Sequence, residues 1–242
     1  MAITDIRKTV LETINEVARK RGLSEVDNLD QNSWSRSALD FLNDVVAEVV
    51  DFGDWDETLV TANTSCQSSA QDYTINYPSS ASADVIKNVK DIFLGSGGTP
   101  LFMINQDQMR ILSRVPRFGT PAQWSIFGTD SNGNPIIRVT PIPVAGQGAG
   151  QVLSIRAWHI PPLYKVGDEA VIIPLNSRIV VQGLLAAVIL DEEGGSATDH
   201  YTREYQKFQS MMKDTYSRFH SQSGRYRRFV PGSRRFRRSR GS

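Results

Sequence analysis

The sequence predicts an α+β protein: a four-helix bundle of two N-terminal and two C-terminal helices, with an inserted antiparallel β lobe and an extended C-terminal arm. Apolar residues recur at helical spacing near both ends of the chain, whereas residues 55–175 show the alternation of half-buried strands. The helices at both ends have apolar faces to bury, and one shared bundle buries them most simply. The predicted regions are N-terminal helices at 1–54, the β lobe at 55–175, C-terminal helices at 176–222 and a basic tail at 223–242.

Both N-terminal helices are predicted to be amphipathic. Residues 3–21 place apolar side chains on one helical face. Gly22 ends the run, because glycine tolerates the left-handed conformation that closes a helix. Asn32 or Ser33 can cap the second helix, which extends as far as Asp51. The apolar stripe of this second helix is broader, so more of its surface is expected in the core.

The middle of the chain predicts an antiparallel sheet of roughly five or six strands. Residues 71–77 alternate aromatic or β-branched side chains with polar ones, and residues 151–159 supply the last strand. The dipeptide Asn132-Gly133 lies between two strand-like segments and predicts a hairpin turn. A short helix is expected at 105–113.

Residues 177–193 leave almost no polar face, so this helix must be buried on most sides. The segment is shorter than the roughly 20 apolar residues that span a bilayer, which places it inside a protein. Asn176 or Ser177 caps its start, and Gly194-Gly195 ends it. A fourth helix at 198–220 carries a largely aromatic stripe. The predicted bundle core contains Leu42, Val46, Leu184, Leu185, Val188, Tyr205, Phe208 and Met212.

Charge is unevenly distributed along the chain. Eight of the 27 Lys and Arg residues follow residue 224, so 19 basic and 26 acidic residues precede the tail. The single cysteine, Cys66, cannot form an internal disulfide, which indicates a reducing compartment. The N-terminus lacks the apolar core of a signal peptide, and no segment is suited to cross a bilayer. We therefore expect a soluble cytoplasmic protein with no membrane partner.

The sequence lacks the residue patterns of an active site. His159, His200 and His220 are isolated, and Cys66 has no neighbouring base or second metal ligand. Residues 130–134 begin like a calcium loop, but Gly133 stands at the fourth position rather than the sixth. We therefore expect no catalytic residues, no metal and no cofactor, and interpret the protein as a non-enzyme.

The basic tail interleaves arginine with aromatic residues and has too little apolar surface to fold alone. Its arginines can neutralise phosphates while its aromatics stack on bases, which would make it a nucleic-acid arm. Alternatively, it docks on another protein and becomes ordered on binding. A solubilising tail without a partner is the third interpretation. The candidate arm residues are Arg225, Tyr226, Arg227, Arg228, Phe229, Arg234, Arg235, Phe236, Arg237, Arg238 and Arg240.

A series of motifs in residues 100–195 resembles the head-to-tail adaptors of tailed bacteriophages, in particular the tail tubular protein A-like gatekeeper or connector proteins. The resemblance lies in a glycine- and proline-containing segment, a strand ending in Pro-x-Pro, a strand ending in Pro-Pro, and an apolar helix after Ile-Pro. Trp124 and His159 stand where the family pattern has tyrosine. The matching residues are Gly119, Pro121, Trp124, Ile126, Gly128, Pro141, Pro143, Pro161, Pro162, Ile173 and Pro174.

The resemblance implies a structural virion protein, assembled in the host cytoplasm, that forms a homo-oligomeric, dodecameric ring. One face would bind the portal protein and the other the tail nozzle, with the helices toward the portal and the β lobe toward the nozzle. Genomic double-stranded DNA would pass through the lumen during ejection. In such adaptors the C-terminal segment reaches between portal subunits, which favours portal docking over DNA binding for the arm. The alternative function is a nucleic-acid-binding structural protein that uses the arm.

Overall fold

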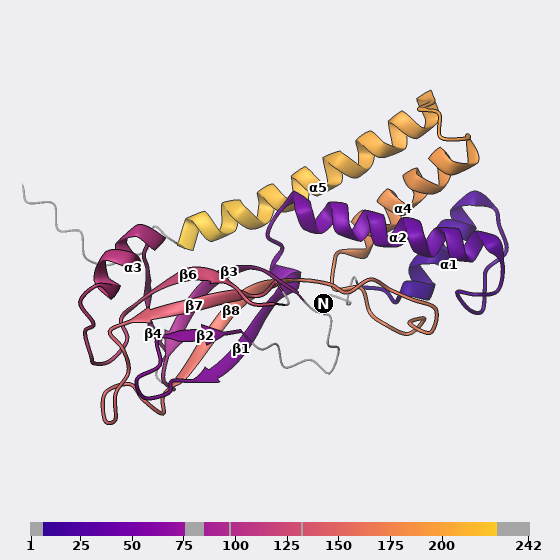
Figure 1. The fold of residues 1–242 in the computed structure, drawn as a ribbon. Helices are drawn as coiled ribbons and strands as arrows, with labels where there is room; N and C mark the ends of the chain where they lie inside the picture. Colours follow the sequence, from indigo (N-terminus) through magenta and orange to yellow (C-terminus); the bar gives the residue numbers. More distant parts are fainter. Residues whose placement is uncertain (1–6, 76–84, 97, 132, 227–242) are drawn as a thin grey trace, which may run out of the picture.

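The computed structural model describes residues 7–75, 85–96, 98–131 and 133–226. A helical part lies at one end of the molecule, and a β part with two sheets lies at the other (Figure 1). Helix α2 leads from the helical part into the first strand of the β part. The helices are α1 (Val10–Arg21), α2 (Ser33–Phe52), α3 (Gln106–Ser113), α4 (Ser177–Glu192) and α5 (Asp199–Tyr226).

The predicted architecture is wrong, although the protein does mix α and β structure. The described residues form five α-helices and two four-stranded sheets, rather than a four-helix bundle with one antiparallel lobe. Helix α4 is apolar on nearly all sides, and α1, α2 and α5 each pack against it. Non-helical segments fill the remaining space in the core. The prediction failed because it assumed that helices alone would cover the apolar faces.

Side-chain caps set the starts of the helices. The Thr9 hydroxyl accepts a hydrogen bond from the Glu12 backbone N–H (3.2 Å), and the Glu12 carboxylate accepts one from the Thr9 N–H (2.9 Å). Helix α1 therefore begins at Val10, later than the predicted start. Residues 1–6 of that prediction lie outside the described residues. Asn32 caps α2 and Asn176 caps α4, in each case one of the two predicted candidates.

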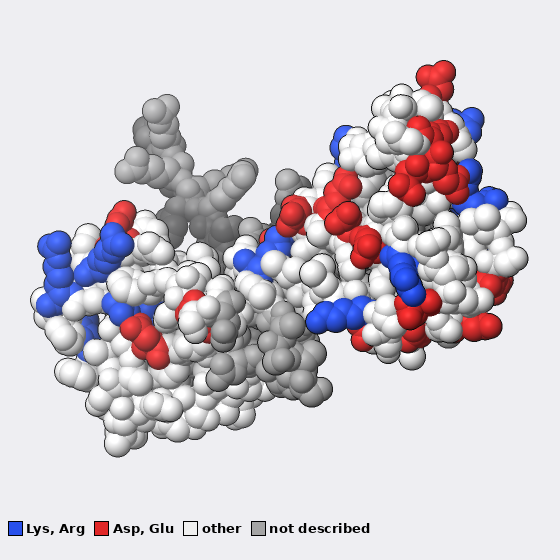
Figure 2. Space-filling model, turned by 45° about the vertical axis from the view of Figure 1, so that its right-hand side comes forward, with Lys and Arg blue, Asp and Glu red and all other residues white. Residues whose placement is uncertain are grey.

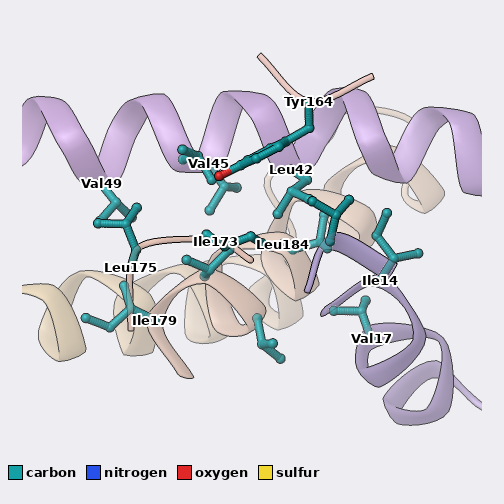
Figure 3. Packing of buried hydrophobic residues seen from close by; sticks show 14 of the residues in the cluster. Ile14, Val17, Leu42, Val45, Val49, Tyr164, Ile173, Leu175, Ile179 and Leu184 are labelled. Carbon is teal, nitrogen blue, oxygen red and sulfur yellow. The ribbon is translucent and has the colours of Figure 1, made fainter. Parts of the chain in front are cut away.

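The core of the helical part is shared between helices and the segment 161–175, which we call the strap (Figure 3). The strap buries Tyr164, Ile173 and Leu175 between α2 and α4. This non-helical contribution distinguishes the core from that of a simple helix bundle. The other labelled residues in this view come from α1, α2 and α4 and are Ile14, Val17, Leu42, Val45, Val49, Ile179 and Leu184.

Hydrogen bonds to the backbone of the strap hold it against two other segments. The Asn43 side chain in α2 donates to the Tyr164 carbonyl (3.0 Å) and accepts from the Tyr164 N–H (2.8 Å). The N–H of Ile173 donates to the carbonyl of Lys8 (3.0 Å). The strap is thereby fixed to α2 and to the residues that precede α1.

The β part consists of two sheets with the strand orders β1-β8-β3-β4 and β2-β7-β6-β5. Strands β5 and β6 are parallel, so the prediction of a wholly antiparallel lobe is wrong, and every other pair is antiparallel among the described strands. Trp124, Ile137 and Ile155 lie in one buried core to which both sheets contribute. The strands are β1 (Leu59–Ser65), β2 (Asp72–Thr74), β3 (Val85–Leu94), β4 (Thr99–Pro100), β5 (Phe102–Met103), β6 (Gln123–Thr129), β7 (Pro135–Thr140) and β8 (Val152–Ile160).

Two local predictions in the β part correspond to observed elements. The predicted short helix is α3, with Asn105 as its N-cap. The predicted hairpin joins β6 to β7, and the Asp130 N–H donates to the Asn134 carbonyl across the turn (2.8 Å). Asn132 of that turn lies outside the described residues. The short helix and the hairpin depend on neighbouring residues only, so they could be predicted although the predicted architecture was wrong.

The helical and β parts meet at the C-terminal end of α2. Lys87 in β3 donates from Nζ to the carbonyls of Val50 (2.6 Å) and Gly53 (2.9 Å). The last turn of α2 contains no basic residue, so Lys87 supplies the positive charge that terminal carbonyls favour. The indole N–H of Trp55 donates to the carbonyl of Val49 (2.6 Å). These bonds fix α2 to the β part.

We expect the substitution Lys87→Met to lower the free energy of unfolding by about 1.5–3 kcal/mol, the range for hydrogen bonds to charged groups. The substitution keeps most of the aliphatic length and removes the ammonium donor, so the α2 carbonyls lose their partner. Guanidinium denaturation would measure the change. Lys90→Met is the matched control, because Lys90 in the same strand forms a surface ion pair with Asp56. Equal losses for both variants would contradict a capping role for Lys87.

Candidate interaction surfaces

Residues of the types used in catalysis are buried or lie apart. Cys66 is buried beside Tyr73, and burial raises the pKa of the Cys66 thiol and raises the pKa of Tyr73 to about 12. His159 is buried, with Nδ1 2.8 Å from the carbonyl oxygen of Thr58. Within the described ranges, no group of three or more His, Cys, Asp and Glu could hold a metal ion. None of the described helices is long and apolar enough to cross a membrane.

The residues predicted for the bundle core lie in the core of the helical part. Leu185 and Tyr205 are partly buried and pack against it. The other six are buried, and Phe208 and Leu184 are 0% exposed. These six are Leu42, Val46, Leu184, Val188, Phe208 and Met212.

Helix α5 extends further than predicted and runs back across the junction toward the β part (Figure 1). The Tyr216 ring lies 5.6 Å from the Phe52 ring and 5.7 Å from the Trp55 ring, so α5 passes the end of α2 at this point. The helix continues from 217 to 226, about 15 Å at 1.5 Å per residue. The arm therefore starts beyond the junction, on the side of the sheets.

The arm residues are divided between helix and undescribed chain. Arg225 and Tyr226, predicted as part of the extended arm, are the last two residues of α5. The prediction ended this helix at residue 220, whereas α5 continues to Tyr226. The remaining arm residues lie outside the described residues: Arg227, Arg228, Phe229, Arg234, Arg235, Phe236, Arg237, Arg238 and Arg240.

One exposed side of α2 carries four acidic residues, Asp40, Asp44, Glu48 and Asp51, which we call the acidic face. Their spacing places them in one row along the helix. The Tyr205 hydroxyl donates to Glu48 (2.7 Å), and this bond raises the pKa of Tyr205. Asp40, Asp44 and Asp51 form no ion pair with any described residue. Neighbouring like charges cost a helix about 0.2–0.5 kcal/mol per pair, so a basic partner would stabilise this face.

Two other acidic residues of the helical part, Glu192 and Glu204, are paired within the chain. Glu192 forms an ion pair with Arg21 from α1. Glu204 accepts from Lys207 (2.7 Å) and from Gln182 in α4 (3.0 Å). The bond from Lys207 is the main cause that lowers the pKa of Glu204. These carboxylates stabilise contacts within the chain, as does Glu48 of the acidic face through Tyr205, whereas Asp40, Asp44 and Asp51 are exposed.

Exposed apolar and basic side chains gather in residues 102–118, in β5, in α3 and in the segment after α3, and we call this set the tip surface. Five of its apolar side chains are between 61% and 71% exposed. A shallow pocket of about 270 Å³ beside them is lined by Ile104, Gln108, Ile111, Leu112 and Gln123. Exposed apolar clusters of this kind typically mark interaction sites. The tip surface comprises Phe102, Met103, Ile111, Val115 and Phe118 with Arg110, Arg114 and Arg117.

The tip surface is also basic. Arg110 lies 3.8 Å from Asp107, whereas Arg114 and Arg117 have no ion pair within the part of the chain that the structure describes. Figure 2 shows basic side chains at one end of the β part and many acidic side chains over the helical part. Charge is therefore separated along the molecule: the tip surface is basic, and the acidic face on α2 is negative.

Sequence reasoning did not find either surface. The sequence does contain a signal for the acidic face, because Asp40, Asp44 and Glu48 follow the i, i+4, i+8 spacing of one row along a helix. The tip surface could not be read from the sequence, because Phe102 and Phe118 follow the same pattern as buried strand residues. Their exposure depends on how α3 and β5 sit at the edge of the sheet.

Comparison with known proteins identifies a family for nearly the whole chain. The model of the family described as SU10 adaptor protein matches residues 2–235. No match was found among curated proteins. The family match confirms the resemblance to phage head-to-tail adaptors that the sequence motifs indicate.

Proposed function

The chain belongs to the SU10 adaptor protein family, and we propose that it is the head-to-tail adaptor of a tailed bacteriophage. In this role the protein is structural and resides in the virion. A ring of identical subunits, dodecameric by resemblance, joins the portal protein to the tail nozzle. Genomic DNA passes through its lumen without being read. The observation that carries this proposal is the family match over residues 2–235.

Features of the molecule support a role in assembly. The tip surface and the acidic face offer two separate contact regions, as a subunit with several neighbours requires. Helix α5 carries the start of the arm past the junction and away from the helical core. An acidic body also suits a lumen in which DNA slides, because like charge prevents it from adhering.

We further propose that the arginine-rich arm contacts the portal protein. Arginine forms bidentate pairs with carboxylates, and the arm's aromatic residues can fill pockets on a protein surface. Many copies of a weak arm bind together effectively, since docking of one arm raises the local concentration of the others. DNA binding by the same arginines is the competing possibility. It depends on positive charge and should persist when lysine replaces arginine, whereas binding to portal carboxylates should weaken.

The proposal is tested by mixing the purified protein with portal assemblies of the same phage, followed by sedimentation and electron microscopy. A variant ending at Tyr226 removes the arm residues that follow α5 and retains every described residue. A second variant replaces the arginines after Tyr226 by lysine, which keeps the charge but loses bidentate pairing. We expect rings of the full chain on the portal, loss of portal binding on truncation, and strongly weakened binding with lysine.

Other results would change the assignment. A ring that persists on truncation would retain the adaptor and move the portal contact to the described surface. If no variant binds the portal, the adaptor proposal fails. Salt-sensitive DNA binding that disappears on truncation and persists with lysine would then favour the nucleic-acid interpretation. The images also test whether the helical part faces the portal, the orientation that the resemblance implies.

A further inference from the structure

We propose that the tip surface of one subunit docks on the acidic face of α2 in the neighbouring subunit. This inference rests on the proposed ring and names the surfaces that build it. The apolar side chains of the tip surface need a protein partner, because aliphatic Met103, Ile111 and Val115 gain little from contact with nucleic acid. The partner must also be acidic, since Arg114 and Arg117 are exposed and without an ion pair among the described residues.

Charge complementarity indicates that a second copy of this chain occupies the tip surface. Residues 106–118 contain three arginines and one aspartate, whereas α2 contains one arginine and four acidic residues. The arm is excluded as an occupant of the tip surface, because its arginines would repel those of the tip. The acidic face therefore supplies the charge that the tip surface lacks.

The two surfaces also match in composition beyond charge. Ala47 is exposed within the row of carboxylates, and Phe52 at its end is 39% exposed. These apolar groups can face the tip's aliphatic side chains while the carboxylates pair with arginines. An interface with an apolar centre and Arg-carboxylate pairs around it has the composition typical of specific protein contacts.

The placement of the surfaces determines the kind of assembly. The tip surface lies at the outer end of the β part, and the acidic face lies on α2 in the helical part (Figure 1). A contact between two different surfaces is heterologous, so each subunit uses one surface toward each neighbour. Repetition of a heterologous contact closes into a ring when the rotation is right. A two-fold dimer would instead require each surface to meet a copy of itself.

Cysteine cross-linking distinguishes these arrangements. Met103→Cys labels the tip surface and Asp44→Cys labels the acidic face, and the native Cys66 is buried. The two full-length variants are mixed and treated with a short bismaleimide, both free and on portal assemblies. We expect dimers that contain one of each variant, and no more product from either variant alone than from the unmodified protein. Same-variant dimers without mixed dimers, or the absence of mixed dimers in both states, would overturn the inference.

A charge exchange tests the chemistry of the contact. Arg114→Glu with Arg117→Glu in the tip variant should reduce the mixed product by about tenfold or more, given tenfold per 1.4 kcal/mol of lost affinity. Asp40→Arg with Asp51→Arg in the other variant should restore it. All four residues are exposed, so these changes leave the fold intact. An unchanged yield after the first exchange would overturn the assigned pairing.

The outcomes separate this inference from the proposed function. Portal binding without mixed dimers would reject the contact and retain the adaptor. Mixed dimers without portal binding would support the contact and reject the proposed partner. Sedimentation with portal assemblies gives the second readout on the same samples.

Discussion

The substitution Gly183→Val is expected to lower the free energy of unfolding by about 3 kcal/mol, near the upper end for overpacked cores. Gly183 lies in α4 where this helix touches both α2 and α5. A Cβ atom at this position would lie 2.6 Å from Val45 Cγ1 and 2.8 Å from Phe208 Cε2. Because the two clashes lie in different helices, the backbone of α4 cannot relieve both by moving. The absence of a side chain at Gly183 is therefore what permits this close packing.

The measurement is guanidinium denaturation followed by circular dichroism. Ala47→Val on the exposed side of α2 is the matched control, because it creates the same side chain in a helix without a clash. Its expected cost is below about 0.7 kcal/mol, from helix propensity alone. If Gly183→Val proves as stable as the control, the close packing of α4 inferred from the structure is wrong.

The second large effect is expected for Phe208→Ala, which should lower the free energy of unfolding by about 3–5 kcal/mol. Phe208 is 0% exposed and belongs to the core cluster that joins α5 to α4. Truncation removes a buried ring and leaves a cavity that surrounding helices cannot fill. Thermal and guanidinium unfolding would both report the loss.

Phe102→Ala serves as the control for this change. The Phe102 side chain is 71% exposed on the tip surface, so truncation should alter stability by less than about 0.5 kcal/mol. The same control variant should weaken the proposed contact between subunits. A large loss of stability from Phe102→Ala, or none from Phe208→Ala, would contradict the burial described here.

The surroundings of α4 show why the architecture could not be predicted. From the sequence, α4 is a nearly continuous apolar helix, and its burial on most sides follows directly. The sequence does not say what covers each side. Helices α1, α2 and α5 all pack against α4, but Tyr164 of the strap belongs to the same core. The strap has no helical or strand pattern in the sequence. A bundle was therefore predicted where a more irregular core exists.

The resemblance to the adaptor family is confirmed over nearly the whole chain, whereas the predicted start of the arm is wrong. The family match covers residues 2–235, and the motifs that indicated it lie mainly in strands and in the turns after them. The arm was recognised by composition, but its start was placed too early, because α5 includes Arg225 and Tyr226.

The sequence by itself determined the features that depend on neighbouring residues: the starts of α2 and α4 to within one residue, the β6–β7 hairpin, the burial of α4 and the charge of the tail. Hydrogen bonds across a few residues and local apolar periodicity set these features. Only the tertiary structure decided that Lys87 caps α2, that the strap enters the core, and that apolar residues around α3 remain exposed. These depend on contacts between segments far apart in the chain, and the same local pattern is compatible with either burial or exposure.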